Sequence, residues 1–265
     1  MSSINVGLAM PFRGVGSIDL HAMCVGTRAK ASQRPDVQVF PFQAWTSLLP
    51  YTFNLCWAGL LNQRSADGLT HFAMLHDDIV PQPGWLDILL AEMDAHDADL
   101  ISAVVPIKDH LGLTSTGIDV TGDLWNPRRL TLAEVHSLPE TFGDAEAGGP
   151  LVLNTGCWVC RIDRPWAEQV CFRQQDKIVK GADGKFEPHT MPEDWDFSRQ
   201  LRSHGAKLLA TRKVQLYHGL PAYTNARVWG SWKTDEACNR EFGTAGVKPA
   251  ATDAAVEPVP AGQAA

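Results

Sequence analysis

The sequence has little charge and no long apolar run. Charged residues make up 20% of its 265 residues and hydrophobic residues 45%, which is ordinary for a globular protein. No uninterrupted apolar run approaches the roughly 20 residues that a membrane-spanning helix needs. The N-terminus lacks a basic segment and a long apolar segment, so we expect no signal peptide and a cytoplasmic location. The net charge of −7 argues against nucleic-acid binding through bulk positive charge.

The six cysteines lack the pattern of a metal or redox site. Cys157 and Cys160 have C-x-x-C spacing, but no second C-x-x-C or H-x-x-x-H pair follows them. The segment that contains them predicts a strand, in which the two side chains point to opposite faces. We therefore expect free, structural thiols rather than a zinc or redox centre.

Apolar runs alternate with amphipathic segments over the first 106 residues. The predicted strands cover residues 4–10, 37–40, 69–75 and 100–105, and the predicted helices cover residues 17–32, 51–62 and 84–96. This alternation predicts the α/β class, with a Rossmann-like, mainly parallel or mixed sheet flanked by helices in a single domain.

The second half of the sequence is less regular. Residues 108–149 and 174–190 predict polar loops, the first with a weak helix at 131–137. The other predicted elements are strands at 151–153, 157–162, 207–210 and 214–217 and helices at 165–170 and 193–203. From residue 243 onward, few large apolar residues occur, which predicts a disordered tail over 243–265. The domain is thus expected to span 1–242, with a nucleotide-binding half at 1–106 and an acceptor-binding half at 107–242.

The segment from Phe72 to Ile79 is the most informative one. Four apolar residues lead directly into His76-Asp77-Asp78, and Pro81 soon follows. The acids therefore lie at the C-terminal end of a strand that is buried on both faces. In open α/β sheets, ligands bind just beyond the carboxyl ends of the strands. Two adjacent carboxylates at this place predict a site for a divalent cation that carries phosphate oxygens.

Three further groups of residues suggest chemistry, each beside a structural alternative. Glu193-Asp194 begin a helix, where a carboxylate is either a favourable terminal charge or a general base. His218 ends a strand; it is either a hydrogen-bonded histidine or, with the acids, part of a Mn²⁺ site. Asn154-Thr155-Gly156 is either a β-bulge or a place where the backbone approaches a ligand.

The order and spacing of these four motifs resemble GT-A glycosyltransferases of the family 2 type. The resemblance extends from Ile4 to Gly219 and includes the run from Glu193 to Phe197. The intervening segments 113–117, 128–131 and 138–142 look most like bacteriophage-type members, which would place the protein in the host cytoplasm. The resemblance implies a metal-dependent, inverting transfer of a sugar from a nucleoside-diphosphate donor, by default a UDP-sugar, to an acceptor hydroxyl.

The resemblance also implies roles for individual residues. Asp78 and His218 would bind Mn²⁺ or Mg²⁺, Asp194 would be the catalytic base, and Glu193 would shape the acceptor pocket. The donor nucleotide would contact Pro11, Arg13, His76 and Asp77, although His76 departs from the D-x-D pattern. The acceptor or the donor sugar would contact Asn154, Thr155, Gly156 and Trp195.

Several alternatives remain open. The acceptor could be a hydroxymethylated base in phage DNA, a surface glycan, a protein or a small molecule; a locally basic stretch, Arg199, Arg202, Lys207, Arg212 and Lys213, is compatible with DNA. Lys108, Arg128 and Arg129 would be either a lid over the diphosphate or solvated surface charge. The competing classes are a nucleotidyltransferase acting on a sugar phosphate and a catalytically inactive binding module.

Overall fold

The computed structural model describes residues 3–12, 31–119, 123 and 125–230. The helix predicted at 17–32, the candidate residue Arg13 and the tail predicted from residue 243 therefore lie wholly or largely outside the described residues. The domain limits at 1–242 stay a prediction.

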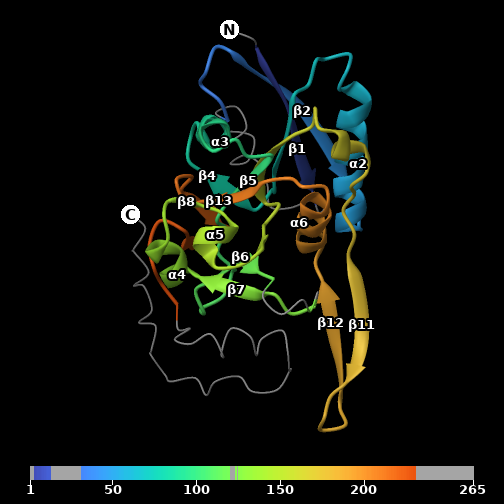
Figure 1. The fold of residues 1–265 in the computed structure, drawn as a ribbon, viewed down its shortest axis with the longest axis vertical. Helices are drawn as coiled ribbons and strands as arrows, with labels where there is room; N and C mark the ends of the chain where they lie inside the picture. Colours follow the sequence, from blue (N-terminus) through green and yellow to red (C-terminus); the bar gives the residue numbers. More distant parts are fainter. Residues whose placement is uncertain (1–2, 13–30, 120–122, 124, 231–265) are drawn as a thin grey trace, which may run out of the picture.

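A seven-stranded sheet forms the centre of the molecule (Figure 1). Its strands follow the order β2 (Val37–Trp45), β1 (Ile4–Phe12), β3 (His71–Leu75), β10 (Cys157–Arg161), β5 (Leu100–Ala103), β13 (Leu208–Thr211) and β8 (Thr141–Phe142). β1 runs parallel to β2 and β3, and β5 runs parallel to β13, whereas β10 and β8 are antiparallel to their neighbours. This confirms the predicted α/β class with a mainly parallel, mixed sheet. Three of the seven strands come from the second half of the chain, so the two predicted halves share one sheet.

Helices cover both faces of this sheet, as Figure 1 shows. The side chains of β3 alternate between two apolar clusters: Phe72 and Met74 belong to one, Ala73 and Leu75 to the other. The first cluster includes residues of α2 (Leu49–Gln63) and α6 (Glu193–Ser203), and the second includes residues of α3 (Trp85–Ala95). Every residue of β3 is buried, which is why Phe72–Leu75 is a continuous apolar run.

The same alternation settles the role of the C-x-x-C pair. Cys157 packs in the α3-side cluster, whereas Cys160 packs in the α2-side cluster. Both thiols are free, and burial raises the pKa of each above its ordinary value. The prediction of structural cysteines is confirmed.

Shorter elements surround the central sheet. β4 (Ile79–Pro81), β14 (Leu216–His218) and β15 (Leu220–Thr224) form one three-stranded sheet, and β7 (Arg128–Thr131), β6 (Leu113–Ile118) and β9 (Leu151–Val152) form another. The other helices within the described residues are α4 (Leu132–Ser137), α5 (Asp144–Ala147) and the 3₁₀ helix η1 (Pro165–Glu168). The helix predicted at 131–137 is confirmed as α4, but the prediction of a loop over the rest of 108–149 was wrong. This segment contains β6, β7 and β8, whose partners include β9 and β13, distant in the sequence.

The segment predicted as a polar loop at 174–190 is also regular. It forms a hairpin of β11 (Gln175–Lys180) and β12 (Phe186–Met191) that projects from the body (Figure 1). Its residues are mostly exposed on both faces, so the sequence shows no apolar alternation. The turn is recognisable afterwards: Gly184 has a φ of 83°, and the amide of Lys185 donates to Asp183 Oδ1 at 3.0 Å. β12 leads directly into α6.

None of the helices within the described ranges is long and apolar enough to cross a membrane.

Candidate functional site

Strand pairing brings Asp78 and His218 together. β14 pairs with β4 in antiparallel register, with His218 opposite Ile79, the residue that follows Asp78. The Nε2 atom of His218 lies 3.3 Å from Oδ2 of Asp78, and the amide of Gly219 donates to the carbonyl of Asp78 at 2.6 Å. The two residues that the sequence predicts as cation ligands thus meet at the carboxyl end of β3, where ligands bind in sheets of this kind.

The hydrogen bond of His218 Nδ1 determines whether Nε2 carries a lone pair that can face Asp78. Nδ1 lies 2.6 Å from the carbonyl oxygen of Pro106, which can only accept a hydrogen bond, so Nδ1 must carry a proton. In the neutral imidazole, the lone pair is then on Nε2 and faces the Asp78 carboxylate. This arrangement suits a protonated His218 or a cation bound between the two side chains; a carbonyl partner on the far nitrogen is typical of metal-binding histidines.

Lys108 is the third group at this carboxylate. Its ammonium forms an ion pair with the same Oδ2 atom of Asp78 that faces His218. Burial by itself would raise the pKa of Asp78, but the hydrogen bonds and charges of His218 and Lys108 outweigh it and hold that pKa well below its usual range. Asp78 is therefore ionised at neutral pH. The sequence left Lys108 as either part of a lid over the diphosphate or solvated surface charge, and it did not predict the contact with Asp78.

The arrangement fits a divalent cation that is shared with a ligand. Two ligand atoms at about 2.1 Å from an ion, and at right angles around it, lie about 3 Å apart, close to the observed separation of Asp78 and His218. Among the described residues, no group of three or more His, Cys, Asp and Glu side chains converges on one point. A cation here would take its other ligands from phosphate and water, as Mg²⁺ commonly does.

The loop 154–156 lies between this cluster and α6. The amide of His76 donates to the carbonyl of Gly156 at 2.8 Å, and the amide of Gly156 donates to Oδ1 of Asn154 at 2.6 Å. A Cβ at residue 156 would lie 2.4 Å from Cδ1 of Ile79, so the side chain of Ile79 would have to move to admit a larger residue. The carboxamide of Asn154 thus shapes its own loop, and Thr155 is buried.

The residue before this loop is hydrogen-bonded to α6. The amide of Leu153 donates to Oγ of Ser198 at 2.9 Å, and that hydroxyl donates to the carbonyl of Asp194 at 2.9 Å. The predicted base is therefore held on the same edge of the sheet as Asp78. Ser198 lies four residues after Asp194, one helical turn along α6, which is the only sequence signal that could have identified it.

Aromatic packing fixes the position of α6. The ring of Phe197 stacks on that of Phe172 with centroids 4.3 Å apart and contacts the rings of Trp57 and Trp158, each at 5.6 Å. All four side chains belong to the α2-side core. This anchor lies one turn after Asp194, so the start of the helix has little freedom to move.

The acidic pair at the start of α6 is electrostatically unusual. Burial, and then the charge of neighbouring Glu193, raise the pKa of Asp194 to about 8, although Arg129 and the amide of Trp195 act in the opposite direction. That amide donates to Oδ1 of Asp194 at 2.8 Å. A carboxylate whose pKa lies near neutrality is suited to accept a proton from a hydroxyl.

Trp195 does not offer an open ring to a sugar. Its side chain is only 1% exposed, and its Nε1 donates to the carbonyl of Ser115 at 3.4 Å. The guanidinium of Arg129 lies over the ring, 4.7 Å from its centroid. The expectation of a sugar contact is therefore corrected: the amphipathic indole is used to hold α6 and Arg129 together. Arg128, the other arginine of the predicted lid, pairs with Glu134.

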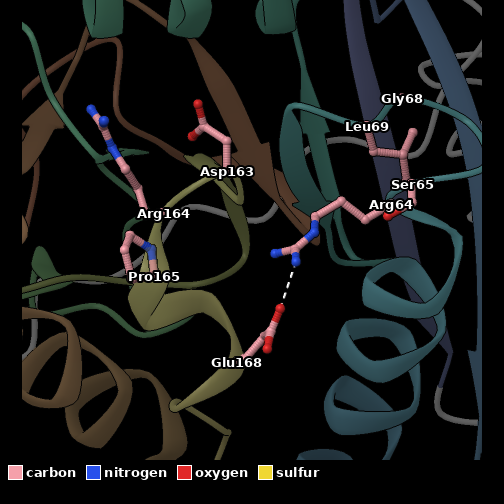
Figure 2. A pocket seen from close by; sticks show the side chains of 8 residues that line it. All are labelled: Arg64, Ser65, Gly68, Leu69, Asp163, Arg164, Pro165 and Glu168. Atoms are coloured by element: carbon pink, nitrogen blue, oxygen red, sulfur yellow. Dashed lines mark hydrogen bonds and ion pairs between the residues drawn. The ribbon is translucent and has the colours of Figure 1, made fainter.

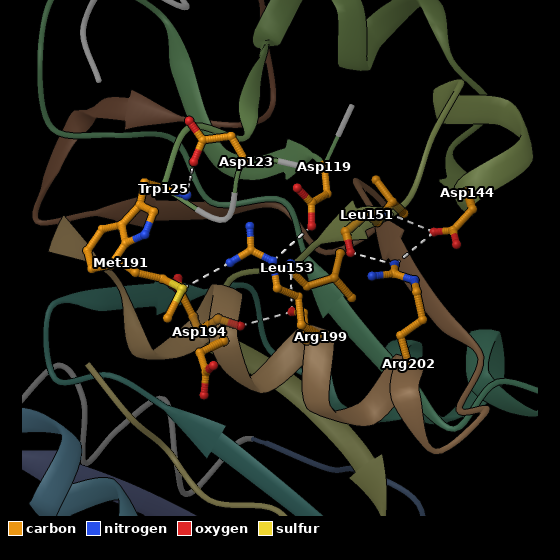
Figure 3. A network of polar contacts seen from close by, with 12 residues as sticks. Asp119, Asp123, Trp125, Asp144, Leu151, Leu153, Met191, Asp194, Arg199 and Arg202 are labelled. Atoms are coloured by element: carbon orange, nitrogen blue, oxygen red, sulfur yellow. Dashed lines mark hydrogen bonds and ion pairs between the residues drawn. The ribbon is translucent and has the colours of Figure 1, made fainter. Parts of the chain in front are cut away.

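Four of the five residues in the basic stretch that was compatible with DNA form ion pairs within the fold. Arg199 pairs with Asp119 at 2.8 Å, and Arg202 pairs with Asp144 at 3.1 Å (Figure 3). In the same view, the carboxylate of Asp194 points away from these ion pairs. The other three members also have protein partners: Arg212 with Glu140, Lys213 with Glu92, and Lys207 with the carbonyl of His96. The stretch gives no support to a DNA acceptor.

The remaining predicted donor contacts are at or near the first strand and the turn after β3. Pro11 extends β1 beyond the predicted end, opposite Ala44 of β2 and past the last residue that pairs with β3. A residue without an N–H is tolerated there because only one neighbouring strand remains. Asp77 is half-buried in the turn after β3, and its role, like that of Pro11, stays a prediction.

A separate pocket lies at the opposite edge of the sheet (Figure 2). Its lining includes Arg64 and Leu69, which precede β3, and Asp163, which follows the antiparallel β10. Arg64 and Glu168 form an ion pair across it at 2.5 Å. None of the predicted site residues lines this pocket.

The sequence matches no known protein-family model and no curated protein sequence. Among solved structures, A197 from STIV is 13% identical, with a TM-score of 0.42, over 87% of this chain and 96% of that one. A UDP-glucose pyrophosphorylase complexed with UDP-glucose is 9% identical, also with a TM-score of 0.42, over 82% of this chain and 93% of that one. Likenesses this distant do not bear on substrate or activity.

Proposed function

We propose that the protein is a glycosyltransferase that moves a sugar from a nucleoside-diphosphate donor to an acceptor hydroxyl. The observation that carries the proposal is the contact of Asp78 with His218 at the carboxyl end of β3, with Nδ1 of the histidine committed to the carbonyl of Pro106. This leaves the Nε2 lone pair of His218 facing Oδ2 of Asp78, and a carboxylate beside an imidazole is a donor pair that suits a cation shared with a diphosphate.

The proposed chemistry needs two functions, and the site has a candidate for each. A divalent cation, when bound by Asp78 and His218, would supply charge neutralisation for the departing diphosphate. Asp194 accepts the proton of the acceptor hydroxyl as the oxygen attacks the anomeric carbon. A single displacement of this kind inverts the anomeric centre and requires one base rather than a pair of catalytic carboxylates.

The donor is taken to be a UDP-sugar by default. The buried start of α6 and the loop 154–156 limit the space around Asp194, because Glu193, Thr155 and Gly156 are all buried. This favours an acceptor that presents a single hydroxyl to the site. A nucleotidyltransferase would instead bind a nucleoside triphosphate and a sugar phosphate. The binding and hydrolysis experiments described next distinguish this class from a glycosyltransferase.

Isothermal titration calorimetry of UDP tests the proposal, with and without Mn²⁺, on the wild type and on Asp78→Asn. Asp36→Asn is the matched control: Asp36 also pairs with a basic side chain, Arg34, at 2.7 Å, but it precedes β2 and thus lies at the opposite edge of the sheet. We expect Mn²⁺-dependent binding of UDP in the wild type and in the control, and its loss in Asp78→Asn.

Donor hydrolysis supplies the second readout. We expect slow release of UDP from a UDP-sugar by the wild type and none by Asp194→Asn, which should still bind UDP. Tight binding of a nucleoside triphosphate, with no affinity for UDP or UDP-sugars, would refute the glycosyltransferase and favour the nucleotidyltransferase.

A further inference from the structure

The ion pair between Lys108 and Asp78 places a positive charge where the proposed divalent cation would bind. The Asp78 carboxylate carries a single negative charge, and its Oδ2 atom already faces both the ammonium of Lys108 and Nε2 of His218. A divalent cation bound by Asp78 and His218 would approach that same oxygen. The ammonium and the cation would then repel each other at a distance of a few ångströms.

We propose that Lys108 is an exchangeable counter-ion of Asp78: it neutralises the carboxylate while no cation is bound and leaves it when a divalent cation binds. This inference rests on the proposed function, since it assumes that Asp78 and His218 bind such a cation.

The surroundings of Lys108 allow this exchange. Its side chain is 43% exposed, and that of Asp78 is 32% exposed, whereas both members of the Arg199–Asp119 pair are only 13% exposed. Lys108 also lies outside the regular strands, between β5 and β6. A partly exposed ion pair is weaker than a buried one, and a long lysine side chain is flexible, so the pair can separate at a modest cost in free energy.

The backbone around the pair leaves space for the lysine. Gly219 has a φ of 78°, and a Cβ at this position would lie 3.1 Å from Cδ of Lys108. The amide of the same glycine donates to the carbonyl of Asp78, so the turn after β14 holds Asp78 by its backbone. Asp78 therefore keeps its position when Lys108 leaves, which is what an exchange requires.

Binding of Mn²⁺ to the nucleotide-free protein tests the inference, measured by electron paramagnetic resonance of the free ion. Lys108→Met removes the competing charge, and we expect it to bind Mn²⁺ about fivefold more tightly than the wild type, the factor that corresponds to a weak exposed ion pair. Lys108→Arg keeps the charge and should bind as the wild type does. Lys185→Met, at the tip of the β11–β12 hairpin and 82% exposed, removes the same charge away from the site and should have no effect.

The outcomes separate the two proposals. If the wild type binds Mn²⁺ and Lys108→Met binds it equally or more weakly, the exchange is refuted and the cation site stands. If neither protein binds Mn²⁺, with or without UDP, the cation in the proposed function is refuted and the exchange with it. An equal gain in Lys185→Met would also refute the exchange, because it would show an effect of net charge alone.

Discussion

Replacing Asp194 by asparagine should stabilise the protein while abolishing its activity. The pKa of this carboxyl is raised to about 8 by burial and by Glu193, from an ordinary value of 3.8. Between these two pH values, the unfolded chain ionises at this position while the folded protein retains the proton. The folded state therefore loses stability as pH rises from about 4 to about 8, and below pH 4 the group has no effect.

The size of the gain follows from the shift. Each pKa unit corresponds to about 1.4 kcal/mol of folding free energy. The full shift would overestimate the gain in folding free energy, because the side chain is partly exposed and because the variant loses a favourable charge at the start of α6. We therefore expect Asp194→Asn to be more stable at pH 7.5 by on the order of 3 kcal/mol. Asparagine can still accept the hydrogen bond from the amide of Trp195 through its Oδ1.

Urea unfolding at pH 4.5, 6 and 7.5 measures the effect, and Asp196→Asn is the control on the same helical turn. Asp196 accepts hydrogen bonds from Arg173 at 2.9 Å and Gln200 at 2.6 Å, so its replacement should destabilise the protein by about 1–3 kcal/mol. An Asp194→Asn variant that is no more stable than the wild type at pH 7.5, or whose gain does not grow with pH, would refute the raised pKa and with it the suitability of Asp194 as a base.

Two further predictions concern the surroundings of Asp194. The kcat/KM of donor transfer should rise with pH towards about 8, because Asp194 must lose its proton to act as a base. Because Arg129 lowers the pKa of Asp194, Arg129→Gln should move this rise to higher pH. A pH–rate profile that is identical in the variant would contradict this assignment. Phe197→Ala should lower the free energy of unfolding by about 3–5 kcal/mol, since it removes a buried ring that stacks on Phe172; a loss below about 1 kcal/mol in urea unfolding would show that this packing does not anchor α6.

Elements with a strong local pattern could be predicted from the sequence. The run Phe72–Leu75 is apolar because β3 is buried on both faces, and Pro50 is compatible with the first turn of α2. The predicted helix at 193–203 has the same limits as α6, ended by Gly205 with a φ of 77°. In each case, burial or backbone conformation leaves a periodicity or a stop signal in the nearby residues.

Elements without an apolar pattern in their own residues could not be predicted. The hairpin of β11 and β12 is mostly exposed on both faces, so its sequence has no apolar alternation that would predict strands. β8 has only two residues, Thr141 and Phe142, and its partner β13 lies about 70 positions away in the sequence. β8 forms because β13 offers an edge to pair with, and an edge is a property of the folded sheet.

The sequence by itself determined the α/β class, the acids after β3, the acidic start of α6 and the opposite orientations of Cys157 and Cys160. Each of these features depends on a pattern of neighbouring residues in the sequence. Only the tertiary structure decided that Lys108 and His218 meet at Asp78, that Arg129 covers Trp195, and that most of the basic stretch forms ion pairs within the fold. Those contacts join residues from separate strands and loops, and their geometry is fixed by strand register and packing, to which no local pattern corresponds.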